Sequence, residues 1–205
     1  MVRQPALNAR HRAPLTTERI IEAALSIVDG QGLGRLTMRR LGDALEVEAM
    51  AIYHHLPRGK EQLLDALVAH VAAAPADVPA PGRGATRWRE ALRTWARGYR
   101  ERLLAHAGVL PLLVTRRNPA ALTDTVASLR EILRQGGVPE RTAAVAAHTL
   151  LSYVVGHTAM EVRGTEPGGP DGPETAATAT EPEGRVDWDA RFTAGLDLVL
   201  AGINP

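Results

Sequence analysis

The sequence of 205 residues contains no cysteine and only one lysine, Lys60. The absence of thiols excludes disulfides and thiolate metal sites, and it suits a reducing cytosol. No apolar stretch reaches the roughly 20 residues that a membrane-spanning helix needs. The polar stretch over residues 1–15 also lacks a signal-peptide core. We therefore expect a cytoplasmic protein without a membrane segment.

The charges are unevenly distributed along the chain, although the net charge is only +1. Local fields decide which partners are attracted. Three arginines and no acid precede residue 16, nine arginines accompany two glutamates over residues 83–117, and residues 161–189 are acidic. The arginine run over 83–117 is either a second nucleic-acid surface or the solvated face of a helix. We favour the solvated face, because arginine dominates the basic residues throughout this chain.

Helical periodicity covers most of the sequence, and no stretch alternates as a strand does, so the predicted fold class is all-α. Capping residues, prolines and glycines mark where the predicted helices begin and end. The apolar stripe of the longest basic helix consists of Trp88, Leu92, Trp95, Tyr99 and Leu103. The predicted helices begin near Thr16 or Thr17, Thr37, Val47, Lys60, Thr86, Asn118, Pro139 and Asp187, with a broken helix after His106.

Two boundaries are expected from composition. The Pro- and Gly-rich run "APADVPAPGRGAT" separates a first domain, residues 1–74, from a second, residues 75–205. Residues 164–184 cannot bury a core and are predicted to form a flexible loop. The helix over 139–162 is apolar on nearly all sides, so we expect neighbours to cover it all round.

Residues 37–56 have the pattern of a helix-turn-helix, in which two short helices flank a tight break. The inward positions are Leu41, Leu45, Val47, Ile52 and Leu56. Ala49, Met50, Tyr53 and His54 then point outward, because residues four apart share a helix face. In this motif the second helix enters the major groove of DNA, where small apolar side chains contact thymine methyls.

The stretch "TTERIIEAALSIVDGQGLGRLTMRRLGDALEVEAMAIYHHLPRGKEQLLDAL" resembles the DNA-binding half of the tetracycline-repressor (TetR) family. The positions that match the family pattern in order are Thr37, Arg39, Leu41, Tyr53, His55 and Lys60. The resemblance implies an N-terminal three-helix helix-turn-helix domain followed by a larger helical domain for ligand binding and dimerisation. Two residues depart from the pattern: Glu46 stands where the family usually has glycine, and Gly59 is an extra residue before the lysine.

The resemblance also implies roles for individual residues. Tyr53, His55 and Lys60 would hold phosphates, and Lys60 at a helix start would add an ammonium to the positive end of the helix dipole. Ala49, Met50 and His54 would face the bases. The complete predicted DNA-contact set is Thr37, Arg39, Arg40, Glu48, Ala49, Met50, Tyr53, His54, His55 and Lys60.

The second half resembles the tetracycline-repressor subgroup in its helix lengths, which implies a dimer through a four-helix bundle. Ser152, Gly156 and Ala159 recur at spacings of four and three, so helix backbones can approach closely there. The predicted dimer contacts are Ser152, Gly156, Ala159, Phe192, Leu196 and Val199. The predicted effector contacts, each of which has an alternative as a core residue, are Trp95, Tyr99, His106, His148, Tyr153 and His157, with Thr158 beside them.

We therefore predict a homodimeric repressor that binds palindromic operator DNA and is released by a small-molecule effector, without a cofactor and with no predicted metal-ligand residues; whether a metal accompanies the effector is left open. His54 and His55 do not suit a metal, because adjacent helical residues diverge by about 100 degrees. One alternative is an effector-free DNA-binding regulator. Another is a small helical enzyme, although no catalytic motif supports it. A nucleoid-type binder would need a basic body, which the acidic stretch argues against.

Overall fold

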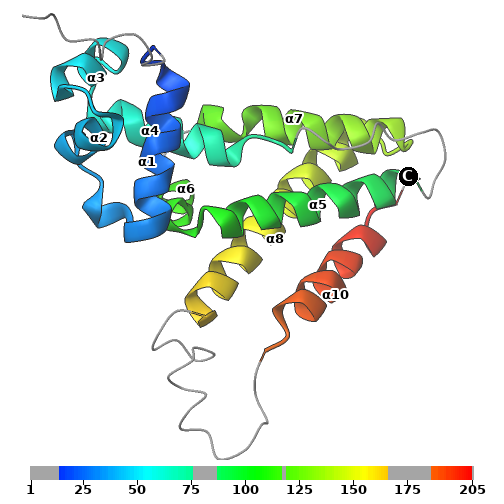
Figure 1. Ribbon diagram of the computed structural model, residues 1–205. Helices are drawn as coiled ribbons and strands as arrows, with labels where there is room; N and C mark the ends of the chain where they lie inside the picture. Colours follow the sequence, from blue (N-terminus) through cyan, green and yellow to red (C-terminus); the bar gives the residue numbers. More distant parts are fainter. Residues whose placement is uncertain (1–13, 76–86, 117–118, 166–185, 205) are drawn as a thin grey trace, which may run out of the picture. The chain divides into compact units, whose positions relative to one another are not determined.

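The computed structural model describes residues 14–75, 87–116, 119–165 and 186–204, and the regular elements in these ranges are helices (Figure 1). The chain divides between Leu64 and Asp65 into two compact units, which we call the head (14–64) and the body (65–204). The division falls inside helix α4 (Lys60–Ala72), ahead of the predicted boundary after residue 74. The last turns of α4 therefore belong to the body.

The head begins with α1 (Thr17–Gln31), and Thr16 is its cap, since its hydroxyl accepts the Arg19 N–H at 3.2 Å. Gly32 ends the helix with φ of 83°, a conformation open to glycine. A short 3-10 turn that the sequence did not predict, η2 (Leu33–Arg35), follows. The buried face of α1 consists of Ile20, Ala24, Leu25, Ile27 and Val28.

The next two helices form the predicted helix-turn-helix. Thr37 caps α2 (Met38–Leu45) by accepting the Arg40 N–H at 3.1 Å, and α3 (Ala49–His55) follows after a tight turn. A Cβ atom on Gly42 would lie 2.8 Å from the carbonyl oxygen of Val47, so only glycine allows this close approach of α2 to the start of α3. Contacts between α1 and α2 and between α2 and α3 complete the head.

The body is built around its longest helix, α8, which packs against α5, α7 and α10 (Figure 1). Its helices are α5 (Arg87–Ala105), η3 (Ala107–Val109), α6 (Leu110–Thr115), α7 (Pro119–Gln135), α8 (Glu140–Thr165) and α10 (Trp188–Ala201). α8 continues past its predicted end at Val162. The predicted caps Thr86 and Asn118 and most of the predicted loop, residues 166–184, lie outside the described residues. Asp187 caps α10 as expected, by accepting the Ala190 N–H at 2.9 Å.

The aromatic stripe of α5 is fully buried, as its spacing predicted, with Trp88, Trp95 and Tyr99 each 0% exposed. The Trp88 ring lies directly on the turn between α7 and α8, because a Cβ atom on Gly136 would be 2.4 Å from its Cγ. Burying a large apolar side chain stabilises a fold by roughly 1.5–3 kcal/mol. These rings therefore hold α5 to the centre of the body.

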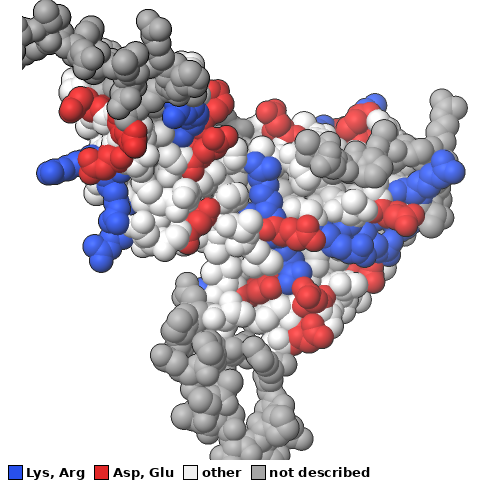
Figure 2. Space-filling model, in the orientation of Figure 1, with Lys and Arg blue, Asp and Glu red and all other residues white. Residues whose placement is uncertain are grey.

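The arginines of α5 form only part of the solvated face that we expected, because Arg87 and Arg97 are exposed whereas three others bond to residues of the last helical segment. In chain order, the partners of these three lie at the end, middle and start of that segment, so α5 and α10 run antiparallel. The pairs are Arg89 with the carbonyl oxygen of Ile203 (2.8 Å), Arg93 with Asp197 (2.9 Å) and Arg100 with Asp189 (2.6 Å). In Figure 2, blue and red side chains are interleaved over the visible face of the body, with no single basic patch there.

Arg100 also makes a buried ion pair with α8. Two of its nitrogens donate to the two carboxylate oxygens of Glu161, at 2.8 and 2.6 Å, and both side chains are only 11% exposed. Bidentate geometry of this kind strengthens an ion pair and fixes its orientation. Arg100 therefore ties α5, α8 and α10 together at one point.

None of the described helices is both long and apolar enough to cross a membrane.

Candidate functional site

The outward face of α3 carries exposed apolar, aromatic and imidazole side chains. Ile52 and Leu56 are 0% and 1% exposed and anchor the helix, while Met50 is 67% and Tyr53 39% exposed. The remaining predicted contacts on and beside this helix are exposed, except for the half-buried Ala49. The exposed residues are Glu48, His54 and His55. The division into an inner and an outer face is the one that the spacing predicted.

The N-terminal end of α2 contributes to a basic groove of the head. Thr37, Arg39 and Arg40 are exposed, and they line an open groove with Arg35 and Asp43. The Thr37 hydroxyl already accepts the Arg40 N–H as a helix cap. Arg35 was not among the predicted contacts. It belongs to the η2 turn, which the helical pattern of the sequence did not predict.

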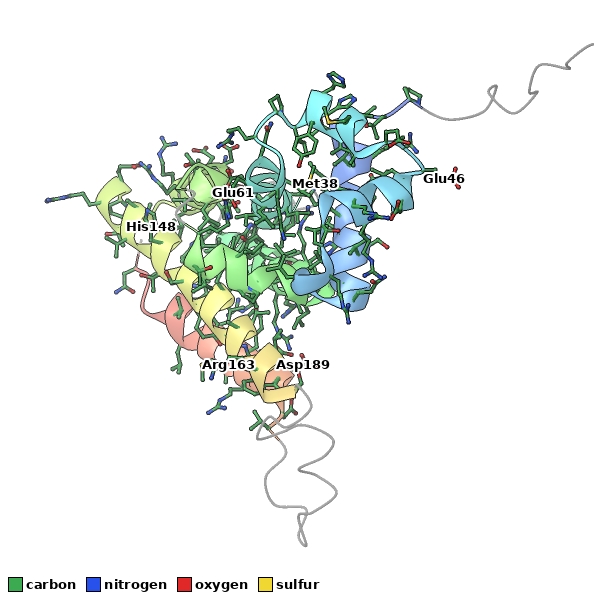
Figure 3. All side chains as sticks on the ribbon, turned by 90° about the vertical axis from the view of Figure 1, so that its left-hand side faces the viewer. Met38, Glu46, Glu61, His148, Arg163 and Asp189 are labelled. Atoms are coloured by element: carbon green, nitrogen blue, oxygen red, sulfur yellow. The ribbon has the colours of Figure 1, made fainter. Side chains whose placement is uncertain are left out.

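The turn between α2 and α3 uses a left-handed residue where the TetR pattern usually has glycine. Glu46 has φ of 54° and ψ of 41°, and it is the one non-glycine residue with positive φ in the described ranges. This conformation costs a non-glycine residue about 1 kcal/mol. The Glu46 side chain points away from the helices of the head (Figure 3). The turn thus keeps its geometry, at the expense of some stability.

Gly59 and Lys60 lie between α3 and the first turn of α4. Gly59 has φ of 57°, its N–H donates to the carbonyl oxygen of Leu56 at 2.8 Å, and Lys60 is the exposed first residue of α4. The additional glycine is therefore accommodated as a left-handed residue in the turn between α3 and α4, directly before Lys60. The ring of Tyr53 lies against it.

The predicted effector residues do not converge on one place. Trp95 and Tyr99 stack in the core with ring centroids 4.8 Å apart, and the Tyr99 hydroxyl donates to the carbonyl oxygen of Ala72 at 3.2 Å. Burial raises the pKa of Tyr99 far above its usual value, so the phenol is neutral. The half-buried His106 instead meets the His70 ring edge-on, with centroids 6.5 Å apart.

A second group of predicted residues lies between α8 and α10. The Tyr153 hydroxyl donates to the carbonyl oxygen of Phe192 at 2.8 Å, and the His157 ring meets the rings of Phe192 and Trp188 edge-on. Burial lowers the pKa of His157, which favours the neutral imidazole. His148 joins neither group, because it is exposed on the outer face of α8 (Figure 3).

The prediction that neighbours cover α8 all round is wrong for the single chain. Val145 and Met160 are 68% and 61% exposed, and the predicted dimer residues Ser152 and Gly156 are exposed on the same side of the helix. Ala159 beside them is half-buried. Sequence reasoning missed Val145 and Met160, although their apolar character at spacings compatible with Ser152 and Gly156 was a usable signal.

Two of the predicted dimer residues on α10 face the interior of their own chain. Phe192 and Leu196 are 1% and 2% exposed within their own chain, where they pack toward α8, so they have no surface to offer to a second chain. Val199 is half-buried, and the exposed apolar residue of this helix is Leu198, at 77%. The apolar spacing found the buried face of α10 and not its outer face.

Comparison with known proteins assigns both units. The sequence profile described as "Bacterial regulatory proteins, tetR family" matches residues 20–67, and the one described as "Tetracyclin repressor-like, C-terminal domain" matches residues 78–205. The tetracycline repressor protein class D of Escherichia coli is 26% identical over 199 residues, which are 94% of this chain and 90% of that protein.

Two solved structures are similar over nearly the whole chain. The TetR family protein ActR of Streptomyces coelicolor, in complex with actinorhodin, is 26% identical with a TM-score of 0.67, over 93% of this chain and 97% of that one. BioQ with its double-stranded DNA operator is 26% identical with a TM-score of 0.63, over 92% and 98%. With a family profile matching more than half of its length and the helix-turn-helix in place, the chain belongs to the TetR family of transcriptional regulators.

Proposed function

We propose that the chain acts as a homodimer that binds a palindromic operator through α3 and leaves it when a small molecule binds the body. The main support is the division of α3, where Ile52 and Leu56 are buried while Met50 and Tyr53 are exposed. A helix held from one side by its core can place its other side in a major groove. The proposal includes no catalytic step, and it places the protein in the cytoplasm with its DNA.

The predicted contact residues of α3 and the start of α4 divide by chemistry into two kinds of contact. Ala49, Met50 and His54 suit the base edges, since apolar groups can touch thymine methyls and imidazole can exchange hydrogen bonds. Tyr53, His55 and Lys60 suit phosphates, which accept from hydroxyl, imidazole and ammonium donors. Thr37, Arg39, Arg40 and Glu48 lie at the helix starts beside them and complete the proposed contact surface.

The exposed side of α8 supports the dimer. Ser152 and Gly156 are small, so a second helix can approach closely, and Val145 and Met160 offer apolar area that is exposed in one chain. Two heads in a dimer meet successive major grooves only if their recognition helices lie about 34–36 Å apart or a multiple of it. The operator would then be a palindrome with that half-site spacing.

Release by a small molecule is supported by the relatives, since ActR is described in complex with actinorhodin. A ligand that binds the body better in one spacing of the heads than in another shifts the dimer toward that spacing. Trp95, Tyr99 and His106 are our candidates for the effector contacts, with Tyr153, Thr158 and His157 as the second group. The ligand itself stays unassigned.

One observation favours the alternative of an effector-free regulator. Trp95 and Tyr99 are 0% exposed and already stack on each other, and His148 points outward, so the predicted effector residues do not form a common lining. Tryptophan fluorescence separates the two cases. A metabolite that both changes the emission and releases DNA supports the effector, whereas operator binding with no responding metabolite supports the alternative.

The DNA-binding proposal is tested with the purified chain and duplexes from its own upstream region, using fluorescence anisotropy across a salt series. Lys60→Ala should weaken binding to every duplex alike and reduce the salt slope by about one, because one phosphate contact is lost. Met50 substitutions should instead change which duplex is preferred.

Arg97→Ala is the matched control, since it removes one exposed cation from the body. It should leave both affinity and slope unchanged, and a slope reduced as much as by Lys60→Ala would indicate a second nucleic-acid surface on α5. No binding to any duplex at low ionic strength would contradict the proposed function.

A further inference from the structure

Gly59 is fixed on both sides by backbone hydrogen bonds. Its N–H donates to the carbonyl oxygen of Leu56 at 2.8 Å, and its own carbonyl oxygen accepts the N–H of Leu63 at 3.1 Å. The residue therefore closes the turn that follows α3 and accepts a backbone hydrogen bond from α4. Its φ of 57° is readily reached by glycine and costly for residues with a Cβ atom.

The absence of a side chain at this position has a second consequence. A Cβ atom on Gly59 would lie 2.7 Å from Cε1 of Tyr53 and 3.6 Å from its Cδ1 and Cζ. Gly59 is itself buried, while Tyr53 is 39% exposed. The edge of the tyrosine ring thus rests on the glycine backbone, and the rest of the ring reaches solvent.

This contact is specific to Gly59 among the left-handed glycines of the described residues. Gly32 and Gly137 have φ of 83° and 86°, but a Cβ atom on either would meet nothing within 4 Å. Backbone conformation alone explains glycine at those two positions. At Gly59 a side chain would, in addition to the backbone strain, displace the ring of Tyr53.

We propose that Gly59 is a positioning residue for DNA binding, which holds the Tyr53 ring in the orientation that offers its hydroxyl to a phosphate. The inference rests on the proposed function, in which Tyr53 contacts the DNA backbone. A side chain that must be immobilised on binding lowers affinity, and one that is already held avoids that loss. Gly59 supplies this preorganisation next to Lys60, the other phosphate contact of the turn.

The test measures operator affinity for Gly59→Ala in the full chain. We expect binding to weaken roughly 3- to 10-fold, the cost of one immobilised side chain. The salt slope should stay at the wild-type value, because a neutral hydroxyl contact releases no counterion and Lys60 is retained. In a Tyr53→Ala background, Gly59→Ala should cause no further weakening, since there is no ring left to displace.

Two variants separate positioning from backbone strain. Gly32→Ala introduces a Cβ atom at another glycine with positive φ but without a ring above it, so it should lower thermal stability and leave operator affinity unchanged. Gly59→Asn carries the same Cβ atom with a smaller backbone penalty, since asparagine enters the left-handed region more readily. It should be more stable than Gly59→Ala and weaken operator binding equally.

Wild-type affinity for Gly59→Ala and Gly59→Asn would overturn the inference and leave the proposed function intact. Equal weakening by Gly59→Ala with and without the Tyr53 ring would also overturn it, because the glycine would then act through the backbone alone. If the wild-type chain binds no duplex, the proposed function fails first and the inference fails with it.

Discussion

In the head, the charged and aromatic side chains of α2 and α3 point to solvent, whereas in the body three arginines of α5 bond to α8 or to the last helical segment. Met50 and Tyr53 are exposed on a helix that two buried residues anchor. Arg100, by contrast, is 11% exposed and makes hydrogen bonds to carboxylates on two other helices. Charged and aromatic side chains are therefore available to a binding partner in the head, whereas in the body they hold helices of the same chain together.

This difference predicts how substitutions behave. A change on the outer face of α3 should alter DNA binding while the fold keeps its stability, because exposed side chains contribute little to unfolding free energies. A change at a buried contact of the body should lower the free energy of unfolding without altering which DNA sequence is preferred. The predictions below test this separation.

Trp88→Ala should have the largest effect, a loss of roughly 3–5 kcal/mol in the free energy of unfolding. Trp88 is 0% exposed and lies on Gly136, so its removal leaves a cavity at the turn between α7 and α8. Urea unfolding followed by circular dichroism measures the loss. Met50→Ala, at a side chain 67% exposed, is the control and should change the free energy by less than about 0.5 kcal/mol. Similar losses of unfolding free energy for Trp88→Ala and Met50→Ala would contradict the proposed difference between the body and the outer face of α3.

Glu161→Gln should cost roughly 2–4 kcal/mol, because it leaves the Arg100 charge without its buried partner. Asp189→Asn is the matched control, as Asp189 also pairs with Arg100 but its side chain is 85% exposed. That substitution should cost less than about 1 kcal/mol, since water screens exposed pairs. Urea unfolding measures both. An equal loss of unfolding free energy in the two variants would show that burial does not strengthen the Arg100–Glu161 ion pair.

Glu46→Gly should stabilise the head by about 1 kcal/mol, because it relieves the left-handed conformation at φ of 54°. Glu46→Ala removes the same carboxylate but keeps the strain, so it should bring no such gain. Thermal unfolding compares the three proteins. If alanine stabilises as much as glycine, the carboxylate and not the backbone is the source of the cost.

The smallest effect is expected from pH. Burial lowers the pKa of His157, Glu161 opposes this shift, and Arg100 and Arg191 add to it. The folded state thus favours the neutral ring, so its contribution to stability is complete above the unfolded pKa of about 6.5 and is lost as pH falls toward the lower folded value. His157→Gln should flatten the decrease in unfolding free energy between about pH 7 and 5. An unchanged decrease would contradict this account of His157.

Much of the head could be predicted because its determinants are local. Thr16 and Thr37 cap their helices through residues three positions away, and the spacing of Ile52 and Leu56 fixes which side of α3 is buried. The left-handed conformation of Glu46 agrees with the glycine that the TetR pattern usually has at this position.

In the body, contacts between residues that are far apart in the sequence could not be predicted. Arg89 donates to the carbonyl oxygen of Ile203, 114 positions away, and Arg100 pairs with Glu161, 61 positions away. A helical pattern identifies the apolar stripe of α5 but cannot say which helix meets its arginines. Likewise, the periodicity of α10 identified Phe192 without indicating that this chain, and not a second one, covers it.

Lys60, the only lysine of the sequence and exposed at the first position of α4, gives the molecule a single side chain open to amine-directed chemistry. A fluorophore or acetyl group attached to this side chain would mark a known point at the start of α4, distinguishable by peptide mapping from modification of the α-amino group. The extent of that modification, with and without an added duplex, would then record occupancy of this surface without any substitution.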